Sequence, residues 1–159
     1  MSRAEDLPLE AAVQEWHRGP FTVSTDRRRL DLDLVHGVLS REFWDARDVS
    51  RASLERAVRG SLCFGLHEGD RQVGFARVIT DLATFAFLTD DFVVESHRGR
   101  GLASWLMECV LSHPDLRGLH RFLLVTRDPR LYRKAGFAPL QEPGEYMELV
   151  TPRPGGAAP

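Results

Sequence analysis

The segment from Phe92 to Met107, FVVESHRGRGLASWLM, restricts the fold of this chain more than any other stretch. It starts as an apolar strand, passes through a loop with two glycines and two arginines, and continues directly as a helix. The helix is indicated by apolar side chains that recur at i, i+3, i+4, i+7 and i+8, namely Leu102, Trp105, Leu106, Cys109 and Val110. Pro114 predicts an end near His113, because the residue before a proline avoids helical geometry. A helix with such a stripe is expected to pack on a sheet.

The rest of the chain supplies the other elements of a layered domain. Expected strands are residues 21–26, a hairpin over 62–80 with its turn at 68–70, and residues 84–95, 120–127 and 145–150. Expected helices are residues 32–41, a segment after Asp48 capped by Ser50 or Ser53, and residues 129–135 with Gly136 as the cap. This order predicts an α/β (α+β) domain with a mixed sheet over residues 21–150. Residues 1–20 are expected to form an N-terminal arm or a frayed helix, and residues 151–159 a flexible tail.

Charge and composition exclude several classes of protein. The chain of 159 residues has the size of one domain. Its formal net charge of -2 lacks the broad positive field that non-specific nucleic-acid binding needs, so an anionic partner must be held locally. No apolar run approaches the roughly 20 residues that cross a bilayer. The two cysteines, Cys63 and Cys109, lie in apolar surroundings, which favours buried thiols and a cytoplasmic location.

The glycine-rich loop is expected to bind an anion. Gly99 and Gly101 let the backbone approach a ligand at the N-terminus of a helix, where unpaired N–H groups favour a phosphate or pyrophosphate. Arg98 and Arg100 would add charge-assisted contacts. The loop is not a Walker A motif, because no Gly-Lys-Ser/Thr follows, and it lacks the third glycine of a dinucleotide fingerprint. A tight turn with solvated arginines explains the pattern equally well.

Two motifs resemble those of the GCN5-related N-acetyltransferase (GNAT) family. Residues 98–103 match the Arg/Gln-x-x-Gly-x-Gly/Ala motif at Arg98, Gly101 and Ala103. Residues 131–140, LYRKAGFAPL, are similar to the family's Tyr-x-x-x-Gly-Phe segment, matched at Tyr132, Gly136 and Phe137. The resemblance covers about residues 21–150 and implies a mixed, splayed central sheet flanked by helices. It also implies acetyl-CoA as co-substrate, no metal, and acetyl transfer to a primary amine of a small molecule or peptide.

The same resemblance implies which residues bind the cofactor. The pyrophosphate would lie against the backbone of the loop and first helical turn, formed by Arg98, Gly99, Arg100, Gly101, Leu102, Ala103 and Ser104. The pantetheine arm would pair with the strand backbone at Phe92, Val93 and Val94. Only the short segment RDPRL separates the strand LLVT from Tyr132, so contacts usually made there would pass to Thr126 or Arg133.

Acetyl transfer to an amine needs a proton acceptor near the amine and a donor near the sulfur. Tyr132 is the expected donor, because a phenol stays protonated at neutral pH and can protonate a leaving thiolate. Asp91 is the first choice as acceptor, with Asp81, Asp90, Glu95, His97 or an ordered water as alternatives. Packing alone is the alternative role of Tyr132, and a solvated charge or structural cap that of Asp91.

Acceptor binding is expected from aromatic side chains. Trp44, Phe85 and Phe87, together with Phe43 and the charges of Asp45 and Arg47, would frame a pocket, although ordinary core packing also explains these aromatics. The expected partners are acetyl-CoA and an amine, with no nucleic acid and no membrane, and a homodimer is compatible with the family. The rival hypothesis is a catalytically silent acyl-CoA-binding regulatory module.

Overall fold

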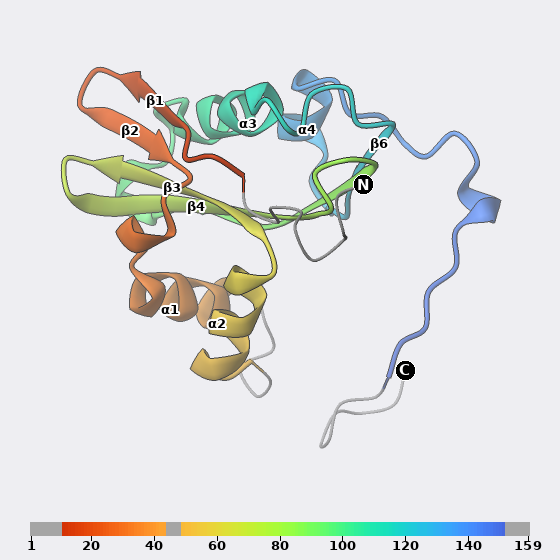
Figure 1. Ribbon diagram of the computed structural model, residues 1–159, viewed down its shortest axis with the longest axis horizontal. Coiled ribbons are helices and arrows are strands. Elements are labelled where there is room, and N and C mark those ends of the chain that lie inside the picture. The colour runs from red at the N-terminus through yellow and green to blue at the C-terminus, as the bar shows by residue number, and fades with distance from the viewer. Residues whose placement is uncertain (1–10, 44–48, 152–159) are drawn as a thin grey trace, which may run out of the picture.

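A mixed sheet of six strands forms the centre of the molecule in the computed structural model, which describes residues 11–43 and 49–151 (Figure 1). The strands are β1 (Glu15–Arg18), β2 (Phe21–Ser24), β3 (Leu62–Glu68), β4 (Arg71–Thr80), β5 (Phe85–Val93) and β6 (Arg121–Leu124). They lie in sequence order across the sheet, antiparallel except for the parallel pair β5 and β6. This arrangement, with helices on both faces, confirms the predicted fold class.

Four α-helices are described: α1 (Leu32–Glu42), α2 (Arg51–Arg59), α3 (Leu102–Ser112) and α4 (Arg130–Lys134). Local capping defines where the first two begin. The Asp31 carboxylate accepts the N–H of Leu34, and Ser50 Oγ accepts the N–H of Ser53, so Ser50 is the cap of α2. The last turn of α3 ends at His113, as Pro114 predicts.

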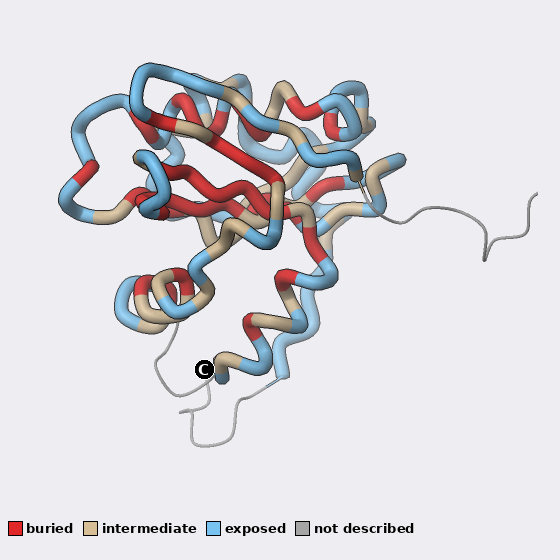
Figure 2. Tube along the Cα trace, turned by 60° about the vertical axis from the view of Figure 1, so that its left-hand side comes forward, coloured by how far each residue is buried: buried red, intermediate tan, exposed pale blue. Residues whose placement is uncertain are grey.

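The two faces of the sheet are covered by different helices. In Figure 1, α1 and α2 lie below the sheet, and α3 and α4 lie above it. Val35, Leu39 and Leu54 of the lower helices pack against Phe75 and Phe92. The upper core is larger, and its buried members include Phe64, Leu88, Trp105, Leu106 and Val110. Figure 2 shows that burial is concentrated in the central strands and the helix faces that cover them. The apolar stripe of residues 102–110 therefore has the predicted role.

Two elements differ from the sequence-based expectation. Residues 15–18, assigned to the N-terminal arm, form β1 and pair with β2 from Glu15↔Ser24 to Arg18↔Phe21. This strand is short and mostly exposed, so its sequence carries little hydrophobic signal. The predicted last strand, residues 145–150, is wrong as a strand of this structure: residues 143–145 form a short 3₁₀ helix, and residues 146–150 lie outside the sheet. Strand geometry needs a pairing partner as well as a suitable sequence.

No helix among the described residues is long and apolar enough to cross a membrane.

Candidate active site

A β-bulge in β5 is the structural origin of the candidate site. Pairing with β4 runs Phe75↔Phe92 and then Arg77↔Thr89, so Asp90 and Asp91 both lie opposite Ala76. Asp90 takes the left-handed conformation with a φ of 58°. The parallel pairing of β5 with β6 reaches Leu88↔Leu124, directly before the bulge. Because a bulge bends its strand, β5 and β6 separate at this point and a cleft forms between them.

The two aspartates of the bulge have different partners. Arg77 Nε and Nη2 each lie 2.8 Å from Asp90 Oδ2, and both side chains are nearly buried, at 12% and 7% exposure. Arg77 Nη1 also donates to Ser61 Oγ at 3.1 Å. A carboxylate held in such a pair is a structural counter-ion, so Asp90 is a poor candidate for the proton acceptor.

Asp91 is bonded to Tyr132. The Tyr132 hydroxyl donates a 2.7 Å hydrogen bond to Asp91 Oδ2, which joins two predicted site residues that lie 41 positions apart in the sequence. Burial raises the pKa of the Asp91 carboxyl, and Tyr132 opposes this shift by its hydrogen bond. Burial and the Asp91 carboxylate raise the pKa of the Tyr132 phenol well above its usual range. The pair therefore combines a phenol that keeps its proton with a carboxylate whose pKa is raised by burial.

A cleft of about 470 Å³ opens beside this pair. It is lined by Phe43, Leu88, Thr89, Asp90, Asp91, Leu124, Val125, Thr126, Arg127, Asp128 and Tyr132. Phe85 and Phe87, predicted to bind the acceptor, are not among these residues. Their part of β5 lies before the bulge, where it is paired with β6. Trp44 lies outside the described residues, whereas its neighbour Phe43 is 54% exposed and faces the cleft.

The glycine-rich loop has the backbone geometry expected of an anion site. Gly99 and Gly101 adopt φ values of 73° and 76°, and a Cβ added to either would meet no atom within 4 Å. Gly101 is the N-cap of α3 and supplies no side-chain hydrogen bond to the helix. The first-turn amides of Leu102, Ala103 and Ser104 have no intrahelical acceptor, as in any helix. Open space and unpaired N–H groups thus coincide at the positive end of an 11-residue helix.

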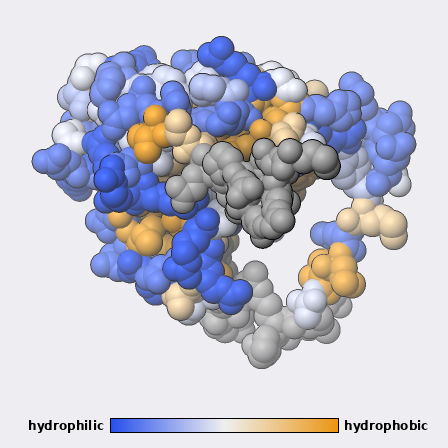
Figure 3. All heavy atoms as spheres, in the orientation of Figure 1, coloured by the Kyte–Doolittle hydropathy of each residue, from blue (hydrophilic) through white to orange (hydrophobic). Residues whose placement is uncertain are grey.

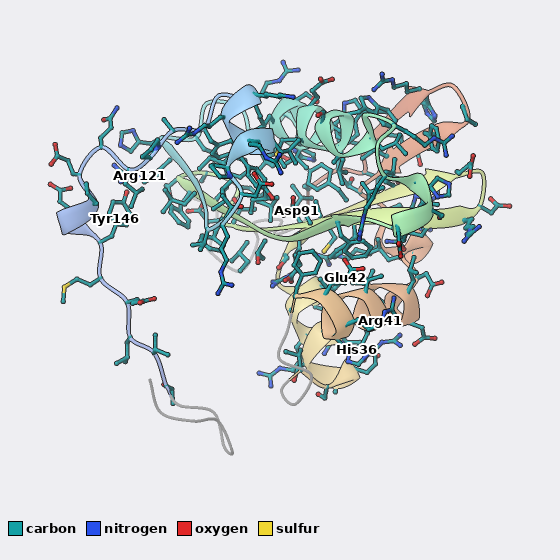
Figure 4. The ribbon with its side chains drawn as sticks, turned by 180° about the vertical axis from the view of Figure 1, so that it is seen from behind. His36, Arg41, Glu42, Asp91, Arg121 and Tyr146 are labelled. Carbon is teal, nitrogen blue, oxygen red and sulfur yellow. The ribbon has the colours of Figure 1, made fainter. Side chains whose placement is uncertain are left out.

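The two loop arginines are placed differently from the expectation that both contact a phosphate. Arg98 Nε donates to Val93 O at 2.8 Å, and Arg98 Nη2 pairs with Glu42 Oε2 at 2.7 Å. Its guanidinium therefore ties the loop to the end of β5 and to α1, where Figure 4 labels Glu42. The Arg100 guanidinium lies 5.3 Å from the ring centre of Phe21. It is the loop arginine better placed to supply charge to a ligand.

The other predicted cofactor contacts lie along β5 and after β6. Val94 N–H bonds to Val73 O of β4, and Phe92 pairs with Phe75. Because alternate strand residues direct their N–H and C=O groups to opposite edges, the Val93 amide faces the side away from β4. The Val93 carbonyl already accepts a hydrogen bond from Arg98 Nε. Thr126 lines the cleft, and its hydroxyl both donates to Asp128 O and accepts Asp128 N–H.

The remaining candidates for the proton acceptor have other partners or lie away from the cleft. Asp81 caps a turn, and the Thr84 hydroxyl and three backbone amides hold the pKa of its carboxyl far below the usual range. His97 is buried, with Nε2 2.8 Å from Glu68 Oε2 and Nδ1 2.8 Å from Ser96 Oγ. Glu95 is exposed in a 3₁₀ turn and does not line the cleft. Asp91 is thus the best-placed carboxylate.

Metal and thiol chemistry receive no support from the described residues. Within them, no group of three or more His, Cys, Asp or Glu side chains could hold a metal ion. Burial raises the pKa of the Cys63 and Cys109 thiols to about 12, so neither is an activated nucleophile.

One contributor to the site was not predicted from the sequence. Arg77 holds the bulge through Asp90, yet nothing in the motifs singles it out. The available signal is its position as a lone cation near the middle of the otherwise mostly apolar strand RQVGFARVIT. A buried cation requires a buried partner, although the sequence does not say which.

The titration of Asp91 gives a prediction with a defined sign. Its folded-state pKa is raised, so it favours folding below the unfolded-state pKa, and this contribution is lost as the pH rises through the folded pKa. Asp91→Asn should therefore increase the free energy of unfolding at neutral pH, with a gain that shrinks in acid. Urea denaturation between pH 4 and pH 8 measures it.

Asp81→Asn is the matched control, because the Asp81 pKa is lowered. Its stabilising effect is present above the unfolded-state pKa and is lost as the pH falls through the folded pKa. The Asp81 variant should therefore lose stability at neutral pH. A loss of the same sign in the Asp91 variant would contradict an ionised, desolvated Asp91.

Comparisons with known proteins agree with this geometry. Residues 59–139 match the model of the acetyltransferase (GNAT) domain. A Gibberella zeae protein, named provisionally as an acetyltransferase, is 35% identical over 138 residues, which cover 72% of this chain and 76% of the relative. A crystal structure from Xanthomonas campestris, described as a GNAT-family acetyltransferase, shares 49% identity with a TM-score of 0.79 and covers 83% of this chain and 94% of its own. A Clostridium acetobutylicum acetyltransferase, solved with acetyl-CoA, has the same fold at 17% identity and a TM-score of 0.56, covering 76% of this chain and 90% of its own.

Proposed function

The chain belongs to the GNAT acetyltransferases, and on that premise we propose that it transfers the acetyl group of acetyl-CoA to a primary amine of a small molecule or peptide. The observation that carries the proposal is the hydrogen bond from Tyr132 to Asp91 at the bulge. Both side chains line the cleft between β5 and β6. This contact supports the proposal, because it joins the proposed proton donor to the proposed proton acceptor where β5 and β6 separate.

The loop before α3 fits the anionic part of acetyl-CoA. Its two glycines leave open space at the helix N-terminus, and Arg100 is the nearby cation. When bound, acetyl-CoA supplies an activated acyl thioester. The proposed role of residues 99–104 is to bind its pyrophosphate through backbone N–H groups, and that of Val93 is to offer its N–H at the free side of β5. Arg98 acts as a positioning residue, because its guanidinium is already used within the protein.

In the proposed reaction, the Asp91–Tyr132 pair takes one proton from the amine and gives one proton to the leaving thiolate. The amine loses a proton as its nitrogen bonds to the acyl carbon, and the departing thiolate gains one as the carbon–sulfur bond breaks. Asp91 accepts the amine proton, and Tyr132 donates its hydroxyl proton to the sulfur. Transfer of the proton from Asp91 to Tyr132 restores both groups. The raised pKa of the phenol keeps Tyr132 protonated at neutral pH.

Thiol release from acetyl-CoA in the presence of a panel of primary amines tests this function. We expect saturable, amine-dependent release and a mass increase of one acetyl group on the accepted amine. Calorimetric titration with CoA measures binding separately. Tight binding without release for any amine in the panel would instead support a silent acyl-CoA-binding module.

The proposed pyrophosphate site predicts that Gly101→Val weakens CoA binding. A side chain at Gly101 would project into the open space of the loop and would strain a residue with a φ of 76°. Loss of the close backbone approach should raise the CoA dissociation constant at least about 10-fold, equivalent to about 1.4 kcal/mol. Calorimetric titration of the folded variant measures the change.

Gly118→Val is the control for backbone strain. Gly118 has a φ of 74°, also has open space around its Cβ direction, and lies between α3 and β6, away from the loop. It should lose similar stability while keeping CoA affinity. Equal loss of affinity in both variants would assign the effect to general destabilisation.

A further inference from the structure

Arg127 is a charged side chain of the cleft without a partner. It lines the cleft together with Asp91 and Tyr132, and it is exposed. Its guanidinium forms no ion pair or hydrogen bond within the part of the chain that the structure describes. A guanidinium carries five N–H donors and keeps its charge at neutral pH, so this side chain can bind an anionic group that enters the cleft.

Two carboxylates that share the cleft with Arg127 are already paired elsewhere. Asp90 belongs to the nearly buried ion pair with Arg77. Asp128 Oδ1 and Oδ2 accept Arg130 Nε and Nη2 at 2.8 and 2.6 Å, and these bonds lower the pKa of the Asp128 carboxyl to about 2. Arg127 therefore keeps a full positive charge toward the cleft, and its complement is a carboxylate of a bound molecule.

Asp91 supplies the opposite charge in the same cleft. Its Oδ2 accepts the Tyr132 hydroxyl, and a carboxylate has lone pairs on both oxygens for further donors. An amine that reaches this pair can donate to Asp91. A molecule that carries both an amine and a carboxylate would thus meet a group of opposite sign for each of its charges.

The remaining lining of the cleft is largely apolar. The apolar side chains are Phe43, Leu88, Leu124 and Val125. Phe43 and Val125 are mostly exposed, so a ligand can cover them. The exposed apolar side chains of residues 147–150 do not contribute, because they lie on the C-terminal segment that Figure 3 shows separated from the main body. The cleft volume of about 470 Å³ lies within the range of small-molecule sites, roughly 300–1,000 Å³.

We propose that the acceptor is an amino acid with an apolar side chain. Its amine is placed at Asp91, its carboxylate binds Arg127, and its side chain packs against Phe43 and Val125. The inference rests on the proposed acetyl transfer, because it assigns the acceptor of that reaction. The products are the N-acetylated amino acid and free CoA: the nitrogen loses one proton, the sulfur gains one, and the carboxylate is unchanged. Arg127 determines specificity and takes no part in the proton transfer.

Three amines with the same benzyl group test the recognition of the carboxylate. They are phenylalanine, phenylalaninamide and phenethylamine, and the corresponding series made from leucine is measured alongside. Thiol release from acetyl-CoA should give a kcat/KM for the amino acid at least about 10-fold above that of either analogue, the effect of one charge-assisted contact. The amide has the less basic amine, so its larger unprotonated fraction at neutral pH works against this preference.

Arg127→Gln should remove the preference by weakening binding alone. The KM for the amino acid should rise roughly 10-fold with little change in kcat, and the values for phenethylamine should stay as in the wild type. Arg127→Lys keeps the charge without the planar fork and should recover part of the affinity. Arg117→Gln is the matched control, because Arg117 is exposed and bonds to Ser112 O at the end of α3, outside the cleft.

The kinetic outcomes separate the inference from the proposed function. Acetylation of the analogues as fast as of both amino acids would overturn the inference and leave the proposed acetyl transfer intact. A preference that persists in Arg127→Gln would overturn the role of Arg127. Loss of the preference in Arg117→Gln as well would assign it to the overall charge of the protein and overturn that role too.

Calorimetric titration of amino acids into the CoA-bound protein gives a readout without acetyl transfer. Phenylalanine or leucine should bind the wild type at least about 10-fold more tightly than Arg127→Gln. This result would support the amino-acid site even if no amine were acetylated, an outcome that would refute the proposed function alone. Aspartate should bind more weakly, because its second carboxylate would replace the apolar side chain. No binding of either apolar amino acid, or equal binding of aspartate, would overturn the inference.

Discussion

Tyr132→Phe is expected to lower turnover by roughly 10²–10⁴-fold, the usual contribution of one positioned acid or base. The substitution removes the hydroxyl that donates to Asp91 Oδ2 and leaves the ring packed against Phe137. Steady-state kinetics with an accepted amine would show a fall in kcat. The dissociation constant for CoA, measured by calorimetry, should change little because the loop before α3 is untouched.

A double-mutant cycle with Asp91→Asn makes this prediction specific. Residues linked in one proton relay act as a unit, so the two substitutions together should cost little more than the more damaging one alone. Fully additive losses would show that Tyr132 and Asp91 act separately. An unchanged kcat in Tyr132→Phe, with folding intact, would remove this residue from the reaction.

Breaking the ion pair behind the bulge should cause the largest loss of stability. Asp90→Asn leaves the Arg77 cation nearly buried beside a neutral amide, and removing one member of a buried pair typically costs 3–5 kcal/mol. Asparagine tolerates the φ of 58° at this position, so backbone strain does not obscure the effect. For a chain of this size, the expected fall in Tm is roughly 6–20 °C. Calorimetry and urea denaturation measure it.

Two further variants define the cause of that loss. Asp90→Asn/Arg77→Met removes both charges and should recover part of the stability, because the uncompensated cation is gone. Glu15→Gln breaks the more exposed pair with Arg29 and should cost at most about 1 kcal/mol. A loss in Asp90→Asn no larger than in Glu15→Gln would contradict a structural role for the buried pair.

The elements predicted best are those whose signal is local. The helices at 32–42, 51–59 and 102–112 agree with the sequence because each combines a cap or a terminating proline with an apolar stripe. Expectations that depend on distant partners were less accurate. Strand β1 was missed since it is short and exposed, and residues 145–150 have a strand-like sequence but no partner strand within the chain.

In the candidate site, too, the residues that the sequence indicated have a local signal, and those that it missed depend on distant partners. The sequence indicated Gly99, Gly101 and Tyr132, because glycines before a helix and the aromatic motif are recognisable from neighbours in the chain. It could not indicate that Arg98 binds Glu42, 56 positions away, or that Phe85 lies outside the cleft. Such outcomes depend on which side chains the folded chain brings into contact.

The sequence by itself therefore determined a strand, a glycine-rich loop and an amphipathic helix in that order, since φ preferences and hydrophobic periodicity act over a few residues. Only the tertiary structure decided that two aspartates in one bulge have different partners. Asp90 meets the buried guanidinium of Arg77, and Asp91 meets the phenol of Tyr132. The reason is physical: burial makes every charge depend on its nearest partner, and sheet pairing, not sequence separation, determines which partner that is.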